Sequence, residues 1–334
     1  MGKNFILSFS FKLIMALCFL IVAFIMAMVF GAVDVQILDV WEAITSSNPS
    51  KEALLIRELR LPREVGAMLV GAALSVSGSI MQGMTRNPLA DPGLLGVTAG
   101  ANAALAITLA LLPSVPYFGI MIACFIGAAL GTGIVFQIAR MKRGGFSPFR
   151  IVLAGAAVSA FLHAIAEGVG IYFKISKDVS MWTAGGLIGT SWSQVYGVLC
   201  FVLIGIAASL FLARHLTILS LDEEVAVGLG QKIKRIKALL FALIVVLAGV
   251  SVALVGNMVF IGLMIPHIAR YVVGTDYRYI IPMSALIGAS FMLVADTLGR
   301  TLQAPFETPV AAIISIIGLP FFLLIVQKGG RAFS

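Results

Sequence analysis

The chain has 334 residues, of which 60% are hydrophobic and 11% are charged, whereas an ordinary soluble domain has about 25% charged residues. This deficit and a mean hydropathy of +1.07 exclude a soluble globular protein and indicate a membrane protein. The net charge of +8 could suggest a nucleic-acid partner. The basic residues, however, lie in short loops between apolar runs, as membrane topology requires, so we expect no nucleic-acid binding.

The apolar runs are long and continuous, which favours transmembrane helices over the short alternating strands of a β-barrel. Each helix needs about 20 apolar residues to cross a bilayer core about 30 Å thick. The sequence therefore predicts an all-α membrane protein with ten spans in one domain over residues 1–334. The predicted spans are 13–33, 64–84, 93–112, 117–139, 150–172, 194–213, 238–256, 259–273, 279–298 and 309–327.

The orientation of these spans follows from the positions of the 23 Lys and Arg residues. Most of them fall on the inner side if the N-terminus is inside, which predicts that both termini are cytoplasmic. The run 13–33 resembles a signal peptide, but it is too long and lacks a good cleavage site, so we expect a retained first helix.

Small residues mark the expected helix contacts. They crowd residues 71–79, and Gly96 and Gly100, like Gly127 and Gly131, are spaced four apart. Because lipid provides no hydrophobic drive between helices, such residues are typical of close backbone packing.

The chain shows no catalytic arrangement. Cys18, Cys124 and Cys200 are isolated in apolar runs, which argues against a metal site or a disulfide framework. A phosphate-binding Gly-rich loop with the required spacing does not occur. We therefore expect no catalytic residue, no metal and no cofactor, and any ATP hydrolysis would belong to a partner.

Four arginines are expected on the outer side, against the general bias. Arg57, Arg60 and Arg63 precede the second span, and Arg300 ends the ninth. They could be snorkelling residues at helix ends, or they could meet a negatively charged partner. Asp296 lies four residues before Arg300, a spacing that predicts an intrahelical ion pair.

The inner loop between spans six and seven, about residues 219–231, predicts a short amphipathic helix. Leu221, Val225 and Leu229 fall on one face, and Ser220 and Glu223 have capping-box spacing. The other residues assigned to this segment are Asp222, Gly228 and Gly230. The helix could lie on the lipid surface, but its acidic start favours docking to a cytoplasmic partner.

Ionisable groups inside a membrane are candidates for function. His163 and Glu167 lie four apart on one face of span five. They could form a proton relay, or they could face a water-filled cavity, which is the interpretation we favour.

Several sequence strings resemble the FecCD family. The strongest are Arg60-Leu-Pro-Arg63, Asn87-Pro-Leu-Ala-Asp-Pro-Gly93, the run 260–270 and Glu307-Thr-Pro309. Members of this family are the membrane subunits of ABC importers for ferric siderophores, haem and cobalamin. The resemblance implies the BtuC-like permease fold of type II importers, with ten helices and a location in the bacterial cell membrane.

The resemblance also implies partners. A second permease subunit, identical or related, would form a dimer around a central path. Two ATP-binding subunits would dock below it and an extracytoplasmic solute-binding protein above. Arg60, Arg63 and Arg300 match family arginines that meet carboxylates of the binding protein, and Arg57 is added as a neighbour. The segment 219–231 matches the region that couples to the ATPase.

The residues Ser147, Pro148 and Phe149 match the cytoplasmic gate region of the family, although their side chains differ from the small hydroxyl pair of the cobalamin permease. Span five would line the path with His163 and Glu167. The expected function is import of iron(III)-siderophore chelates. The alternatives are a cobalamin or haem permease, or a proton-coupled secondary carrier that uses His163 and Glu167.

Overall fold

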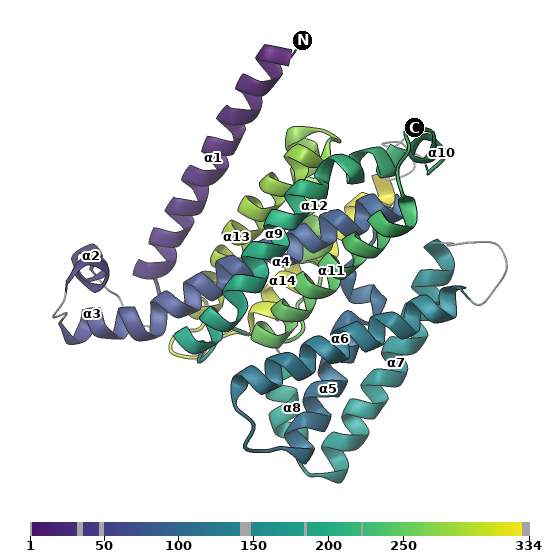
Figure 1. The fold of residues 1–334 in the computed structure, drawn as a ribbon. Helices are drawn as coiled ribbons and strands as arrows, with labels where there is room; N and C mark the ends of the chain where they lie inside the picture. The colour runs from purple at the N-terminus through teal and green to yellow at the C-terminus, as the bar shows by residue number, and fades with distance from the viewer. Residues whose placement is uncertain are drawn as a thin grey trace.

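The computed structural model describes residues 2–31, 36–46, 50–140, 148–183, 186–221 and 223–328. The regular structure in these ranges is helical, which confirms the predicted all-α fold class (Figure 1). The elements are α1 (Gly2–Val29), α2 (Ile37–Thr45), α3 (Lys51–Leu55), η1 (Ile56–Arg60), α4 (Leu61–Thr85), η2 (Pro92–Leu95), α5 (Val97–Leu111), α6 (Tyr117–Arg140), α7 (Pro148–Tyr172), α8 (Ser176–Thr183), α9 (Trp192–Leu221), α10 (Glu223–Gly228), α11 (Ile233–Val255), α12 (Ile261–Val273), α13 (Tyr277–Thr301) and α14 (Val310–Lys328).

Ten helices coincide with the ten predicted spans. Among the described residues, eight helices are long and apolar enough to cross a membrane. The other two spans correspond to the shorter apolar helices α5 and α12. Each of these starts late because the residue before it, Gly96 or Phe260, takes a left-handed backbone conformation, with φ of 75° and 67°.

One predicted span, 64–84, is the inner part of a much longer helix. The helix runs without a break from Lys51 to Thr85, through the π-helical turn η1. At 1.5 Å per residue these 35 residues extend about 52 Å, more than the bilayer core of about 30 Å. The segment of α3 and η1 therefore stands outside the core, and Figure 1 shows it with α2 as an arm beside the bundle.

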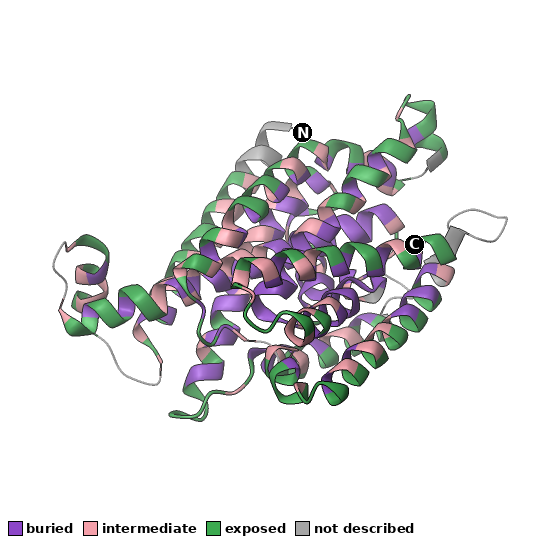
Figure 2. Ribbon diagram, turned by 60° about the horizontal axis from the view of Figure 1, so that its bottom comes forward, coloured by how far each residue is buried: buried purple, intermediate pink, exposed green. Residues whose placement is uncertain are grey.

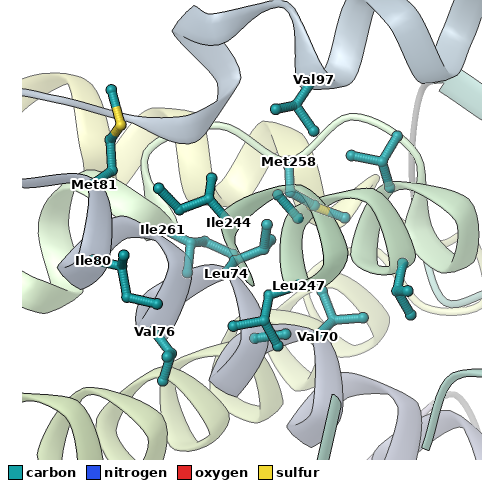
Figure 3. Packing of buried hydrophobic residues seen from close by; sticks show 14 of the residues in the cluster. Val70, Leu74, Val76, Ile80, Met81, Val97, Ile244, Leu247, Met258 and Ile261 are labelled. Atoms are coloured by element: carbon teal, nitrogen blue, oxygen red, sulfur yellow. The ribbon is translucent and has the colours of Figure 1, made fainter. Parts of the chain in front are cut away.

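The helix α4 forms the centre of the bundle. Its most apolar window is 89% buried, against 17% for α1, and it contacts α9, α11, α12 and α13. Figure 2 shows the buried residues concentrated along these central helices. In Figure 3, Leu74 and Ile80 of α4 lie close to Ile244 of α11 and Ile261 of α12.

Glycines allow the closest helix contacts, as the sequence predicted. A Cβ atom added at Gly71 of α4 would lie 2.2 Å from the carbonyl oxygen of Gly288 on α13. One added at Gly100 of α5 would lie 2.1 Å from the carbonyl oxygen of Gly127 on α6. The two glycine pairs spaced four apart therefore meet each other across α5 and α6, which confirms their role in packing.

The helices α5, α6, α7 and α8 form a group at one side of the molecule (Figure 1). The apolar window of α7 is only 28% buried. Its exposed face carries Ala156, Ala160, Ala164 and Gly168, spaced four apart. Small residues in this pattern are typical of a helix surface that packs closely against another helix.

Candidate functional site

A buried cluster of charges joins α4 and α13 at the end of the bundle nearest η1. Arg63 is at its centre. The Nη2 atom of Arg63 lies 2.9 Å from Asp296 Oδ1 and 2.9 Å from Glu307 Oε2. Its Nε donates to Asp296 Oδ2 at 3.0 Å and its Nη1 to Glu307 Oε1 at 2.9 Å. The guanidinium thus bridges two carboxylates, the geometry in which arginine binds carboxylates most strongly.

Arg300 is the second cation of this cluster. Its Nη2 donates to Glu64 Oε1 and, at 3.1 Å, to the carbonyl of Ala27 on α1. Its Nε lies 3.0 Å from Asp296 Oδ2, which confirms the predicted ion pair. The carboxylates of Glu64 and Asp296 are fully buried, and the second oxygen of Glu64 has no hydrogen-bond partner among the described residues. Glu64 therefore depends on Arg300 for its compensation.

This arrangement divides the predicted docking set into arginines that pair inside the protein and arginines nearer its surface. Arg300 is only 4% exposed, so its guanidinium is not accessible to an outer partner in this conformation. The Arg63 side chain is 11% exposed and paired internally. Both residues of the predicted Asp296–Arg300 ion pair are buried in a larger network.

Arg60 and Arg57 lie on η1, before the start of α4. The Nη1 of Arg60 donates to the carbonyls of Met28, at 2.8 Å, and Val29, at 3.2 Å. It thereby caps the C-terminus of α1, where the helix dipole favours a cation. Arg57 is exposed on η1, and its carbonyl accepts a hydrogen bond from Trp192 Nε1 at 3.0 Å. Arg57 and the half-buried Arg60 are the members of the set that the outer surface presents.

Sequence reasoning missed Glu64 and Glu307 as partners of the arginines. One signal was present: Glu64 follows Arg63 directly and falls inside a predicted span, where an ionisable residue indicates a paired or functional group. Its partner is 236 residues away in the chain, so the sequence could not identify it.

The predicted coupling segment is a short exposed helix at the opposite end of the bundle (Figure 1). Leu221, Val225 and Leu229 are 68%, 48% and 64% exposed, while Ala226 is buried against the core. The helix α10 ends at Gly228, and Gly230 follows with a φ of 76°. The segment therefore carries several exposed apolar side chains at one end of the bundle.

The capping box predicted for this helix is wrong. Ser220 lies within the last turn of α9, which continues eight residues past the predicted span end at residue 213. Its hydroxyl donates to the Thr217 carbonyl at 2.7 Å, as serines inside helices often do. Asp222 and the side chain of Glu223 lie outside the described residues.

The predicted gate region is largely outside the described part of the chain. Ser147 is among the residues not described, and α7 begins at Pro148, which suits the first turn of a helix. The side chains of Pro148 and Phe149 are likewise not described.

His163 and Glu167 are both exposed on α7 and both line a cavity of about 490 Å³. The two residues therefore share one cavity, and the water-facing pair stays a prediction. The cavity lies where α7 meets α5 and α8, and Asn102 and Asn257 add polar groups to its wall.

The loop between α4 and α5 is built from its own side chains. Asn87 Oδ1 accepts from the Leu89 amide at 3.0 Å, and Asp91 Oδ1 accepts from the Gly93 amide at 2.7 Å. Burial raises the pKa of Asp91 to about 6, and the bond from Gly93 offsets part of this effect. The loop is therefore a turn that caps η2. In the described ranges no group of three His, Cys, Asp or Glu residues could hold a metal ion.

We expect Arg300→Met to destabilise the protein by about 3–5 kcal/mol, because it leaves Glu64 and Asp296 buried without their cation. Adding Glu64→Gln should recover part of the loss, since it removes one uncompensated charge. The measurement is thermal melting of the detergent-solubilised protein.

The matched control for this prediction is Arg278→Met on the same helix. Arg278 is 57% exposed in its pair with Asp276, so its loss should cost no more than about 1 kcal/mol. Equal melting of the two single variants would contradict the structural role of Arg300.

The comparisons with known proteins agree with this architecture. A family profile described as the FecCD transport family matches residues 19–328. Among similar proteins is the iron(3+)-hydroxamate import system permease protein FhuB of Bacillus subtilis, 44% identical over 96% of this chain and 83% of that protein. The Fe(3+)-citrate import system permease protein YfmD of the same organism is 41% identical, over 90% of this chain and 89% of its own length.

Two further comparisons extend this result. The hemin transport system permease protein HmuU of Yersinia pestis is 38% identical over 89% of this chain and 90% of that protein. A solved structure of an inward-facing transporter, assigned to the metal-chelate type of ABC transporter, superposes with a TM-score of 0.82. It is 26% identical, and the match covers 96% of this chain and 99% of that one.

Proposed function

The chain belongs to the FecCD transport family, and on that premise we propose that it is the permease subunit of an ABC importer for iron(III)-siderophore chelates. One observation carries the proposal: the family match and the fold match both extend over nearly the whole chain. The relatives named for hydroxamate and citrate chelates, at 44% and 41% identity, favour a ferric siderophore. The relative named for hemin makes haem the second candidate.

The mechanism divides the work between subunits. Two ATP-binding subunits would hydrolyse ATP, and this chain would only form the path. A second permease subunit would pack on the exposed small-residue face of α7, where Ala160 and Ala164 allow a close approach. We propose that the N- and C-termini are cytoplasmic, because most Lys and Arg residues then lie on the inner side.

The coupling role of α10 and its flanks rests on their exposed apolar side chains. Leu221 at the end of α9, Val225 on α10 and Leu229 just after α10 are all exposed, and exposed apolar side chains in one short segment indicate a surface for a partner. An ATPase subunit that binds there would move the end of α9, to which α10 is joined, and so transmit its closure to the bundle.

Docking of the solute-binding protein would involve Arg57 and Arg60. Both lie at the outer end of the long α3–η1–α4 helix, and both are more accessible than Arg63 and Arg300. Acidic side chains of the partner would meet these arginines. The internal cluster would hold the surface in place beneath them.

The central experiment is uptake by vesicles that contain this chain, its ATPase subunits and its binding protein. We expect ATP-dependent accumulation of a radiolabelled ferric siderophore, with no competition from cobalamin. Competition by haem alone would select the haem alternative. Uptake that needs no ATPase and stops when the proton gradient collapses would instead identify a secondary carrier.

Arg57→Glu should weaken binding of the solute-binding protein about tenfold, because it reverses an exposed charge at the contact. Binding to the permease in nanodiscs is the measurement, at low and high salt. Arg278→Glu, at the opposite end of the bundle, is the control and should bind normally. Unchanged affinity of Arg57→Glu would remove this residue from the docking surface.

Val225→Asp should cost about 2 kcal/mol or more of ATPase binding, roughly a thirtyfold loss, because it buries a charge in an apolar contact. The measurement is the yield of ATPase subunits on co-purification. Leu302→Asp, which changes another exposed apolar residue just after α13, is the control. Full retention of the ATPase by Val225→Asp would return α10 to a position on the lipid surface.

A further inference from the structure

The cavity between α5, α7 and α8 has a distinct electrostatic character. Its volume of about 490 Å³ lies in the range of sites for small-molecule ligands. The polar side chains in its lining are Asn102, His163, Glu167, Ser176, Ser180, Thr183 and Asn257. The remaining lining residues are small or apolar. As far as the described residues define it, the wall thus combines amide and hydroxyl groups, one imidazole and one carboxylate.

Cations lie near this cavity but not in its wall. Lys174 and Lys177 are exposed on the loop before α8 and on α8 itself, and neither belongs to the lining. The carboxylate of Glu167 is exposed on a helix that crosses the membrane. A charge at such a position is costly unless it faces water or a ligand of complementary charge.

The position of the cavity places it beside the expected path. Glu167 precedes Gly168 of the exposed small-residue face of α7, on which a second permease subunit would pack. The cavity therefore borders the face on which the second subunit would pack, and in a dimer arranged around a central path Glu167 would lie beside that path.

Ferric chelates differ in net charge, and a cavity wall that contains the carboxylate of Glu167 can distinguish chelates by that charge. Three hydroxamates cancel the charge of Fe(III), and a pendant ammonium group makes the complex cationic. Citrate and catecholate complexes remain anionic. A carboxylate at close range repels an anionic chelate and attracts a cationic one, by an amount that falls as the salt concentration rises.

We propose that this cavity is a selectivity subsite for neutral or cationic ferric chelates of the trihydroxamate type. Glu167 disfavours anionic chelates, and the amide and hydroxyl groups around it bind the oxygen-rich surface of the ligand. The inference rests on the proposed function and deepens it by naming the class of substrate.

The test compares two radiolabelled chelates in vesicles that hold the complete importer, at one fixed pH above neutrality. One is a neutral ferric trihydroxamate and the other is a trihydroxamate with a pendant ammonium group. The readout is the ratio of cationic to neutral uptake, with the binding protein saturated. Because the binding protein is the same throughout, a change in the ratio reports the permease.

We expect Glu167→Lys to lower this ratio about tenfold and Glu167→Gln to lower it by a smaller factor. The control is Asp178→Lys, which makes the same charge change at an exposed position of α8 outside the lining and should leave the ratio unchanged. If Glu167→Lys does not insert, Glu167→Gln, which keeps the shape of the side chain, decides the question.

An unchanged ratio in both Glu167 variants would overturn the inference. So would wild-type uptake of ferric citrate at a rate equal to that of the hydroxamates. Either result leaves the importer function intact. A complete importer that takes up no ferric chelate at all would instead overturn the proposed function and this inference together.

Discussion

The buried charge cluster at the N-terminus of α4 and the C-terminus of α13 is the constraint on which the arrangement of the bundle depends. The two helices approach so closely at Gly71 and Gly288 that no side chain fits between them. Nearer the N-terminus of α4 and the C-terminus of α13, Arg63 and Arg300 lie between the two helices together with their carboxylate partners. Buried charges cost several kcal/mol each unless they are paired, so the cluster tolerates few other relative positions of the two helices.

The same cluster holds the C-terminal end of α1, whereas its N-terminal half contacts the bundle through Phe9 and Tyr279 and through the bond from Lys12 to the Val272 carbonyl. Only 17% of the apolar window of α1 is buried. Its last carbonyls accept hydrogen bonds from Arg60 and Arg300, which join the end of α1 to α4 and α13. The outer arginines therefore act first on the protein itself. An arginine that pairs inside the protein is not accessible to a partner. The surface available for docking is therefore defined by the arginines that remain exposed.

Much of the fold was predictable because the membrane imposes it. Ten apolar runs became ten helices, and the small-residue pairs of α5 and α6 met as expected. The helical extension over α3 and η1 was missed because it lies outside the bilayer, where Lys51, Glu52 and Arg57 interrupt the hydropathy but not the helix. Hydropathy reports the thickness of the lipid, not the length of the helix.

The site was predictable only where residues are close in sequence. The pair of Asp296 and Arg300 could be read from its spacing, whereas the partners of Arg63 lie 233 and 244 residues away. The capping box failed for another reason: inside a long helix a serine hydroxyl finds a carbonyl one turn back, and this bond competes with the cap.

The bundle contains a tightly packed centre around α4 and a more exposed helix, α7. The window of α4 is 89% buried, and its glycine and charge contacts leave little room for movement. The window of α7 is 28% buried, and this helix carries both the small-residue face and the wall of the polar cavity. A transporter must keep its packing while one surface changes its neighbours. Here the well-packed helices supply the stability, and α7 is left with an exposed face of small residues and with His163 and Glu167 on the wall of the cavity.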